Sequence, residues 1–129
     1  MKKHFRIIGI VLLIALIAVL IWFGNVMLGN PVSHALASKA AKAYLSDRFS
    51  DTDYEMERIT HSFKDGRYHA FMVSPTSIDG DFSVCFSMLG EYCYDTYDSV
   101  LDGWNTAQRL ESEYRKLTDT ILNDPALPY

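Results

Sequence analysis

Residues 7–28 read IIGIVLLIALIAVLIWFGNVML, and this stretch decides how the rest of the chain is arranged. It contains no charged residue. As an α-helix rising about 1.5 Å per residue it would be about 33 Å long, against about 30 Å of hydrocarbon in a bilayer. Backbone polar groups at that depth must be satisfied within the segment, so a single spanning segment has to be helical. We therefore expect residues 7–28 to form a transmembrane helix that contacts the lipid bilayer.

Three basic residues, Lys2, Lys3 and Arg6, precede the apolar stretch, and no acidic residue accompanies them. By the positive-inside rule, basic residues beside a membrane segment stay in the cytoplasm. These three residues therefore set the topology. We expect a single-pass protein of the cytoplasmic membrane, with residues 1–6 as a cytoplasmic stub and residues 30–129 as an extracytoplasmic domain.

A cleaved signal peptide is the alternative interpretation of the same stretch. Ala35-Leu36-Ala37 has the small-x-small form of a cleavage site, and cleavage after Ala37 would release a secreted protein. Against cleavage, the apolar run is longer than the ~7–15 residues of a signal-peptide core. The alanines also lie well beyond its end at Leu28. The sequence favours the uncleaved anchor and leaves cleavage open.

The part after the anchor begins with a helix signal, Asn30-Pro31, because Asn caps helices and Pro suits their first turn. Apolar residues then recur at helical spacing: Leu36, Ala37, Ala40, Ala41, Tyr44, Leu45 and Phe49. The alanines among them predict close packing on a sheet. A second helix is expected near the C-terminal end, where Asn105 resembles an N-cap. Its apolar stripe has 3-4-3-4 spacing: Ala107, Leu110, Tyr114, Leu117 and Ile121.

Four strand-like runs lie between these helices: Tyr54–Phe63, a run from Arg67 that Pro75 ends, Phe82–Met88 and Glu91–Tyr97. Asp65-Gly66 predicts a two-residue type I′ turn that pairs Lys64 with Arg67. The alternation slips near Glu57-Arg58, where we expect a bulge. The element order predicts an α+β fold in which a four-stranded antiparallel sheet is covered on one face by both helices.

Several of these residues together resemble a known family. They are Asn30-Pro31, residues 40–45 (AAKAYL), Tyr54, residues 62–68 (SFKDGRY), Asn105-Thr106, Arg109-Leu110 and Tyr114. This set resembles the YfjL-like family, small single-pass membrane proteins of Gram-positive bacteria with no assigned function. The resemblance covers nearly the whole chain. It implies the same architecture, and it brings no catalytic residue to any position here.

The chemistry-bearing residues form no recognisable catalytic or metal pattern. His61 and His69 fall on opposite faces of the predicted hairpin, so they cannot converge on one metal. A calcium loop starting at Asp51 would need Gly at its sixth position, which is Met56. There is no Gly-x-Ser-x-Gly sequence and no Gly-rich phosphate loop. We therefore expect no cofactor, no metal and no enzyme activity.

The charge distribution restricts the class of binding partner. Beyond the anchor the chain holds nine Lys or Arg against all 16 Asp or Glu. Nucleic-acid binding depends on basic residues that neutralise phosphates, so no nucleic acid is expected. The sequence favours a non-enzymatic binding or sensing module with an envelope protein as partner. The alternative is a small cell-envelope enzyme that hydrolyses peptide or glycan.

Cys85 and Cys93 are the only cysteines. If residues 88–90 form a three-residue hairpin loop with Gly90 left-handed, Cys85 faces Cys93 directly, on the more exposed sheet face. Opposed strand residues have Cα atoms about 4.5–5.5 Å apart, which a disulfide tolerates, and disulfides persist outside cells. A two-residue loop would instead pair Cys85 with Tyr94 and leave two free thiols. The sequence leaves both arrangements open.

Overall fold

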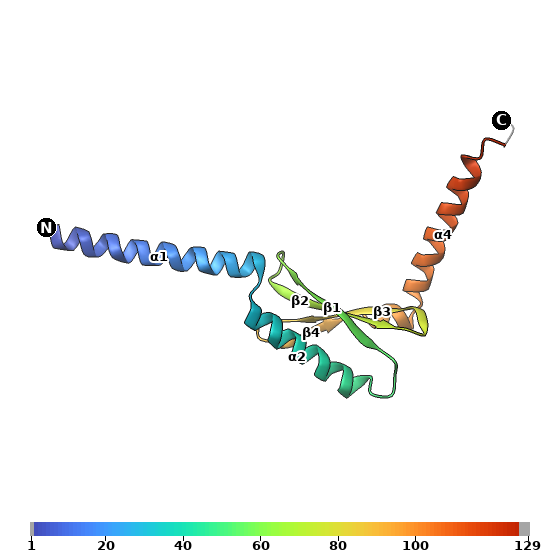
Figure 1. The fold of residues 1–129 in the computed structure, drawn as a ribbon, viewed down its shortest axis with the longest axis horizontal. Helices are drawn as coiled ribbons and strands as arrows, with labels where there is room; N and C mark the ends of the chain where they lie inside the picture. The colour runs from blue at the N-terminus through green and yellow to red at the C-terminus, as the bar shows by residue number, and fades with distance from the viewer. Residues whose placement is uncertain (1, 127–129) are drawn as a thin grey trace.

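The computed structural model describes residues 2–126, and its elements are arranged as an α+β fold (Figure 1). The predicted fold class is confirmed. The elements in chain order are α1 (Lys2–Leu28), α2 (Pro31–Arg48), β1 (Glu55–Ser62), β2 (Arg67–Ser74), β3 (Ser77–Phe86), β4 (Tyr92–Asp95), α3 (Asp98–Leu101) and α4 (Trp104–Leu122). The strands form one antiparallel sheet in the order β1-β2-β3-β4.

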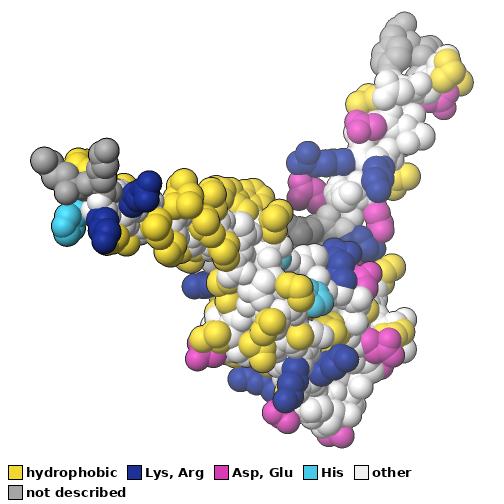
Figure 2. Space-filling model, turned by 60° about the vertical axis from the view of Figure 1, so that its left-hand side comes forward, with side chains coloured by type: hydrophobic (Ala, Val, Ile, Leu, Met, Phe, Trp, Pro, Cys, Tyr) yellow, Lys and Arg dark blue, Asp and Glu magenta, His cyan; other side chains and the backbone are white. Residues whose placement is uncertain are grey.

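Helix α1 stands free of the rest of the molecule along most of its length (Figure 1). It is part of the one stretch of described helix that is long and apolar enough to cross a membrane, by length and composition. Its apolar side chains form a continuous band, and basic side chains gather near its first turns (Figure 2). The predicted span, residues 7–28, lies within this helix.

A short joint connects α1 to α2. Gly29 adopts a φ of 72°, which ends α1, and the side-chain oxygen of Asn30 accepts a hydrogen bond from the Ser33 amide at 2.7 Å. The predicted Asn30 cap is thereby confirmed. Tyr68 of β2 holds the joint from the sheet side: its hydroxyl accepts from the Asn30 amide (3.0 Å) and donates to the Asn30 carbonyl (3.2 Å). Tyr68 is 1% exposed.

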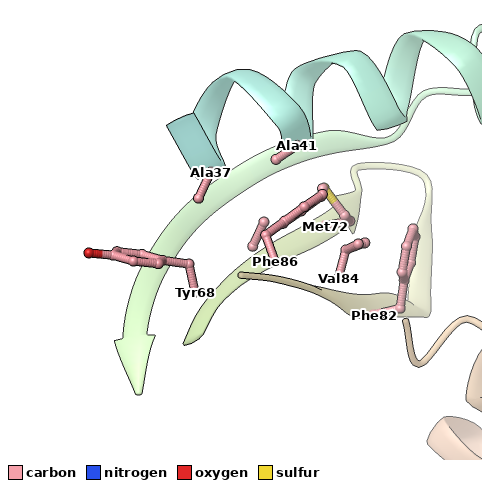
Figure 3. Packing of buried hydrophobic residues seen from close by; sticks show 8 residues of the cluster. Ala37, Ala41, Tyr68, Met72, Phe82, Val84 and Phe86 are labelled. Atoms are coloured by element: carbon pink, nitrogen blue, oxygen red, sulfur yellow. The ribbon is translucent and has the colours of Figure 1, made fainter. Parts of the chain in front are cut away.

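Helix α2 covers one face of the sheet, and the core lies between them (Figure 3). Ala37 and Ala41 of α2 are fully buried, so the predicted close approach of an alanine-faced helix is confirmed. The sheet contributes alternate residues of its two central strands: Tyr68, Ala70, Met72, Phe82, Val84 and Phe86. Because the side chains of a strand alternate between faces, these residues form one apolar layer under α2.

The register of the β1–β2 hairpin differs from the prediction. Ser62, and not Lys64, pairs with Arg67, so residues 63–66 form the connection. Gly66 has a φ of 67° and donates its amide to the Ser62 carbonyl at 2.8 Å, while Asp65 accepts from the Arg67 amide. The wider turn satisfies these backbone groups locally. A shift of two residues leaves Ile59 and His61 on their predicted face, but Phe63, predicted opposite Tyr68, lies in the turn and is exposed. The predicted bulge lies between Met56 and Arg58.

Strand β3 begins at Ser77, five residues before the predicted Phe82. The reason lies in the preceding turn, where the Asp53 carboxylate accepts hydrogen bonds from the Ser74 hydroxyl (2.9 Å) and the Thr76 amide (3.2 Å). Ser74 and Ser77 then pair directly. A distant acidic side chain therefore stabilises a tight reversal, and β3 can start immediately after it.

The prediction that both helices cover the sheet is wrong, because α4 projects away from it (Figure 1). The predicted Asn105 cap is also wrong: Gly103, with a φ of 75°, occupies the cap position. The Asn105 side-chain amide instead donates to the carbonyls of Asp79 (3.1 Å) and Asp81 (2.7 Å). These contacts attach the start of α4 to β3 and direct the rest of the helix into solvent.

Replacing Tyr68 by Phe removes both hydrogen bonds to the Asn30 backbone and leaves the half-buried Asn30 amide without this partner, whereas the Asn30 carbonyl still accepts from the His34 amide. We expect Tyr68→Phe to lower the free energy of unfolding by about 1–3 kcal/mol, measured by chemical denaturation of the full chain in detergent micelles. Tyr114→Phe is the matched control, because Tyr114 is 72% exposed. Equal stability of the two variants would show that the joint contributes nothing.

Candidate functional site

A row of exposed apolar side chains lies along one side of α4. Five residues make up this surface, the α4 stripe: Ala107, Leu110, Tyr114, Leu117 and Ile121. The side chains of Leu110, Leu117 and Ile121 are 53%, 63% and 58% exposed. Isolated exposed apolar residues are ordinary, but a contiguous row of them marks an interaction surface. No residue of α4 is buried.

An ion pair fixes the direction of α4. The Arg109 guanidinium makes two hydrogen bonds to the Asp79 carboxylate, at 2.7 Å and 3.1 Å, and a third to Glu113 at 3.0 Å. Paired donors in a fork give this contact a defined geometry. The bonds from Arg109 lower the pKa of Asp79. With Asn105, this pair holds the base of the helix while the stripe stays uncovered.

A second cluster secures the edge strand β4 to α2. The Asp95 carboxylate accepts hydrogen bonds from the hydroxyls of Tyr44 (2.8 Å) and Tyr92 (2.7 Å), whose rings stack at 5.7 Å. The Arg48 guanidinium lies over both rings. Burial opposes ionisation of Asp95, but the two hydroxyls and Arg48 together lower its pKa. The polar groups of this cluster bond to one another, so the cluster stabilises the packing of β4 on α2.

Two histidines flank the joint between α1 and the sheet, which the sequence did not reveal. The rings of His34 and His61 lie 6.1 Å and 5.1 Å from the ring of Tyr68. The Nε2 atom of His61 is buried without a hydrogen-bond partner. His69 pairs with Cys85 on the other face of the sheet, as predicted. Within residues 2–126 no three His, Cys, Asp or Glu side chains converge on a metal position.

The two cysteines lie on neighbouring strands in an arrangement that combines features of both alternatives. The three-residue loop 88–90 forms, with Gly90 at a φ of 81° and the Ser87 amide bonded to the Glu91 carbonyl at 2.8 Å. The register then shifts between Cys85 and Phe86, so Cys85 pairs with Tyr94 and Cys93 lies in a bulge. Of the two arrangements that the sequence left open, the structure therefore has the pairing of Cys85 with Tyr94.

Both thiols are free in the structure, and Cys85 is fully buried rather than on an exposed face. Burial raises the pKa of the Cys85 thiol, and the neighbouring Cys93 raises it further. In a bulge, two successive residues oppose one partner residue. Here Cys93 is the unpaired residue between Tyr92, which pairs with Phe86, and Tyr94, which pairs with Cys85.

The three basic residues that are predicted to set the topology lie at the opposite end of the molecule from α4. Lys2, Lys3 and Arg6 fall in the first two turns of α1. Arg6 is followed by the apolar band without interruption. This arrangement agrees with a helix whose cytoplasmic end is marked by positive charge.

Comparison with known proteins identifies a family. A family model described as YfjL-like, N-terminal domain, matches residues 2–96. The matched range takes in α1, α2 and the whole sheet, and it ends just before α3 and α4. No curated protein matches the chain, and no solved structure matches it.

Cys93 is next in sequence to Tyr94, the strand partner of Cys85, and this proximity predicts a disulfide in the chain isolated without reductant from an oxidising compartment. After denaturation we expect no titratable thiol in that chain and one in the Cys93→Ser variant. The bridge would stabilise the fold by about 2–3 kcal/mol, since it closes a short loop. Two reactive thiols per unreduced wild-type chain would contradict the prediction.

Proposed function

The chain belongs to the YfjL-like family, and from that premise we propose that it is a membrane-anchored, non-enzymatic binding module that presents α4 to a protein partner outside the cytoplasm. The exposed α4 stripe is the observation that carries this proposal. Burial of such a stripe against another protein removes apolar surface from water, which is the main driving force of association.

The joint at Asn30 supports an uncleaved anchor. Cleavage after Ala37 would cut α2 within its span Pro31–Arg48 and would remove the Asn30 cap. It would also leave the Tyr68 hydroxyl without both of its backbone partners. Because these groups are part of the folded domain, the domain depends on residues that a signal peptidase would discard.

The state of the carboxylates favours binding over hydrolysis. A glycoside or peptide hydrolase needs an acid whose pKa is raised toward neutrality. Among the described residues, the carboxylates with a resolved shift are Asp53, Asp65, Asp79 and Asp95, and each pKa is lowered. Hydrogen bonds to the protein's own hydroxyl, amide or guanidinium groups stabilise the ionised forms. These four ionised carboxylates therefore contribute to the stability of the fold.

Topology is tested by a reporter enzyme fused after Tyr129. We expect the reporter to be active outside the cytoplasm and to stay in the membrane fraction. Neutral replacement of Lys2, Lys3 and Arg6 should reduce or scramble this orientation, because positive charge sets it. A soluble product that begins near Ser38 would establish cleavage and overturn the anchor.

The binding role is tested by photo-crosslinking in intact cells. Leu117 on the stripe and Ser112 on the opposite side of α4 are replaced in turn by p-benzoylphenylalanine in the full chain. We expect a light-dependent protein adduct from position 117 and none from position 112, because only the stripe is buried in the complex. Equal yields from both positions, or no adduct from position 117, would count against a partner on the stripe.

A further inference from the structure

We propose that the α4 stripe is a self-association surface, on which α4 of a second copy of this chain docks. The inference rests on the proposed binding function and names its partner. It starts from the spacing of the stripe, 3-4-3-4 along one side of the helix. A stripe this narrow is the seam of a two-helix coiled coil, whereas a helix that packs on a sheet or core has a wider apolar face.

The residues fit the heptad positions of such a pair. Ala107, Tyr114 and Ile121 take the a positions, and Leu110 and Leu117 take the d positions. Leucine at d is typical of paired helices. Each of these side chains would fill a hole between residues of the facing helix and would leave solvent on pairing.

The charges beside the stripe permit pairing with an identical helix. The flanking e and g positions hold Trp104, two acids, Glu111 and Glu113, and three threonines: Thr106, Thr118 and Thr120. In a parallel, in-register pair, Glu113 faces Thr118 of the second copy and Glu111 faces Thr106. No like charges oppose one another, so self-pairing avoids the repulsion that commonly prevents it.

The bilayer fits the stripe less well. An amphipathic helix that lies on a membrane surface has a polar face rich in Lys and Arg. The polar side of α4 is balanced, with Arg109, Arg115 and Lys116 against Glu111, Glu113 and Asp119. Helices α1 and α4 also leave the sheet from opposite ends: Gly66 in the β1–β2 turn lies next to Val26 of α1, whereas α4 is attached at Asp79 (Figure 1).

The size of the contact suits two copies that share a membrane. Helix α4 has 19 residues and is about 28 Å long. A helix pair of this length is a modest contact beside the roughly 1,200–2,000 Å² of a stable interface. Two copies anchored in one bilayer have a raised effective concentration, which strengthens a weak contact without adding atoms to it. The anchor and the short stripe therefore complement each other.

Two differently tagged full-length copies expressed together test the proposal, each with p-benzoylphenylalanine at position 117. We expect a light-dependent adduct of twice the chain mass that contains both tags, and none from position 112. An adduct of one tagged chain with a different protein would overturn the second copy as partner while sustaining the binding module. Absence of any adduct from position 117 would overturn both.

Two double variants distinguish loss of the contact between the two copies from loss of folding. Leu110→Glu/Leu117→Glu places charge on the stripe, and we expect it to reduce dimer formation about tenfold or more in sedimentation of the full chain in micelles. Gln108→Glu/Ser112→Glu adds the same charge elsewhere on α4 and should leave the dimer intact. Thermal unfolding of all three chains, at a dilution at which each is monomeric, should coincide, because α4 contributes no buried residue to the core. Equal dimer populations in both double variants would overturn the proposal.

Discussion

The Tyr68 hydroxyl makes the contact on which the placement of the anchor helix depends. It both accepts from and donates to the Asn30 backbone, at the one place where α1 gives way to α2. A flexible linker there would let the domain swing freely. Gly29 lies so close that a Cβ atom on it would come within 2.7 Å of the same hydroxyl. The glycine, the asparagine cap and the buried tyrosine therefore make a single rigid joint, which neighbours α1 on one side and the core on the other.

Beyond this joint, α2 holds the rest of the domain together, because it contacts both the face of the sheet and the edge strand β4. Helix α2 can lie close to the sheet because Ala37 and Ala41 present almost no bulk. At its far end Tyr44 and Arg48 reach the edge strand through Asp95, so β4 is secured although it has only four residues. A short edge strand is otherwise weakly held. The cluster also positions the chain where it leaves β4 for α3 and α4.

Helix α4 differs from the other elements because it is attached to the domain only at its base. Its base is held by hydrogen bonds to Asp79 and Asp81, while its apolar stripe contributes nothing to the core. The family match also ends before it, at residue 96. A domain of the YfjL-like type thus bears a helix whose apolar stripe is not covered by the domain itself. Self-pairing would use the anchor as well as the helix, because confinement in a membrane favours short contacts.

Much of the fold follows from the sequence, because its signals are local. The length of the apolar stretch, the Asn30-Pro31 start, the alanine face of α2 and the alternation of Phe82, Val84 and Phe86 are each set by periodicity or by solvation of one element. The same periodicity also predicted the apolar stripe on α4.

The tertiary structure decided what depends on partners far apart in the chain. The Asp53 contacts set where β3 begins, and the register shift at Phe86 pairs Cys85 with Tyr94 and leaves Cys93 in a bulge. The contacts of Asn105 and Arg109 with Asp79 turn α4 away from the sheet that its stripe was expected to cover. Periodicity tells which side of a helix is apolar, but it cannot tell what that side meets. The direction of α4 is set by hydrogen bonds between residues some 30 positions apart in the sequence, and these bonds can form only once the sheet has formed.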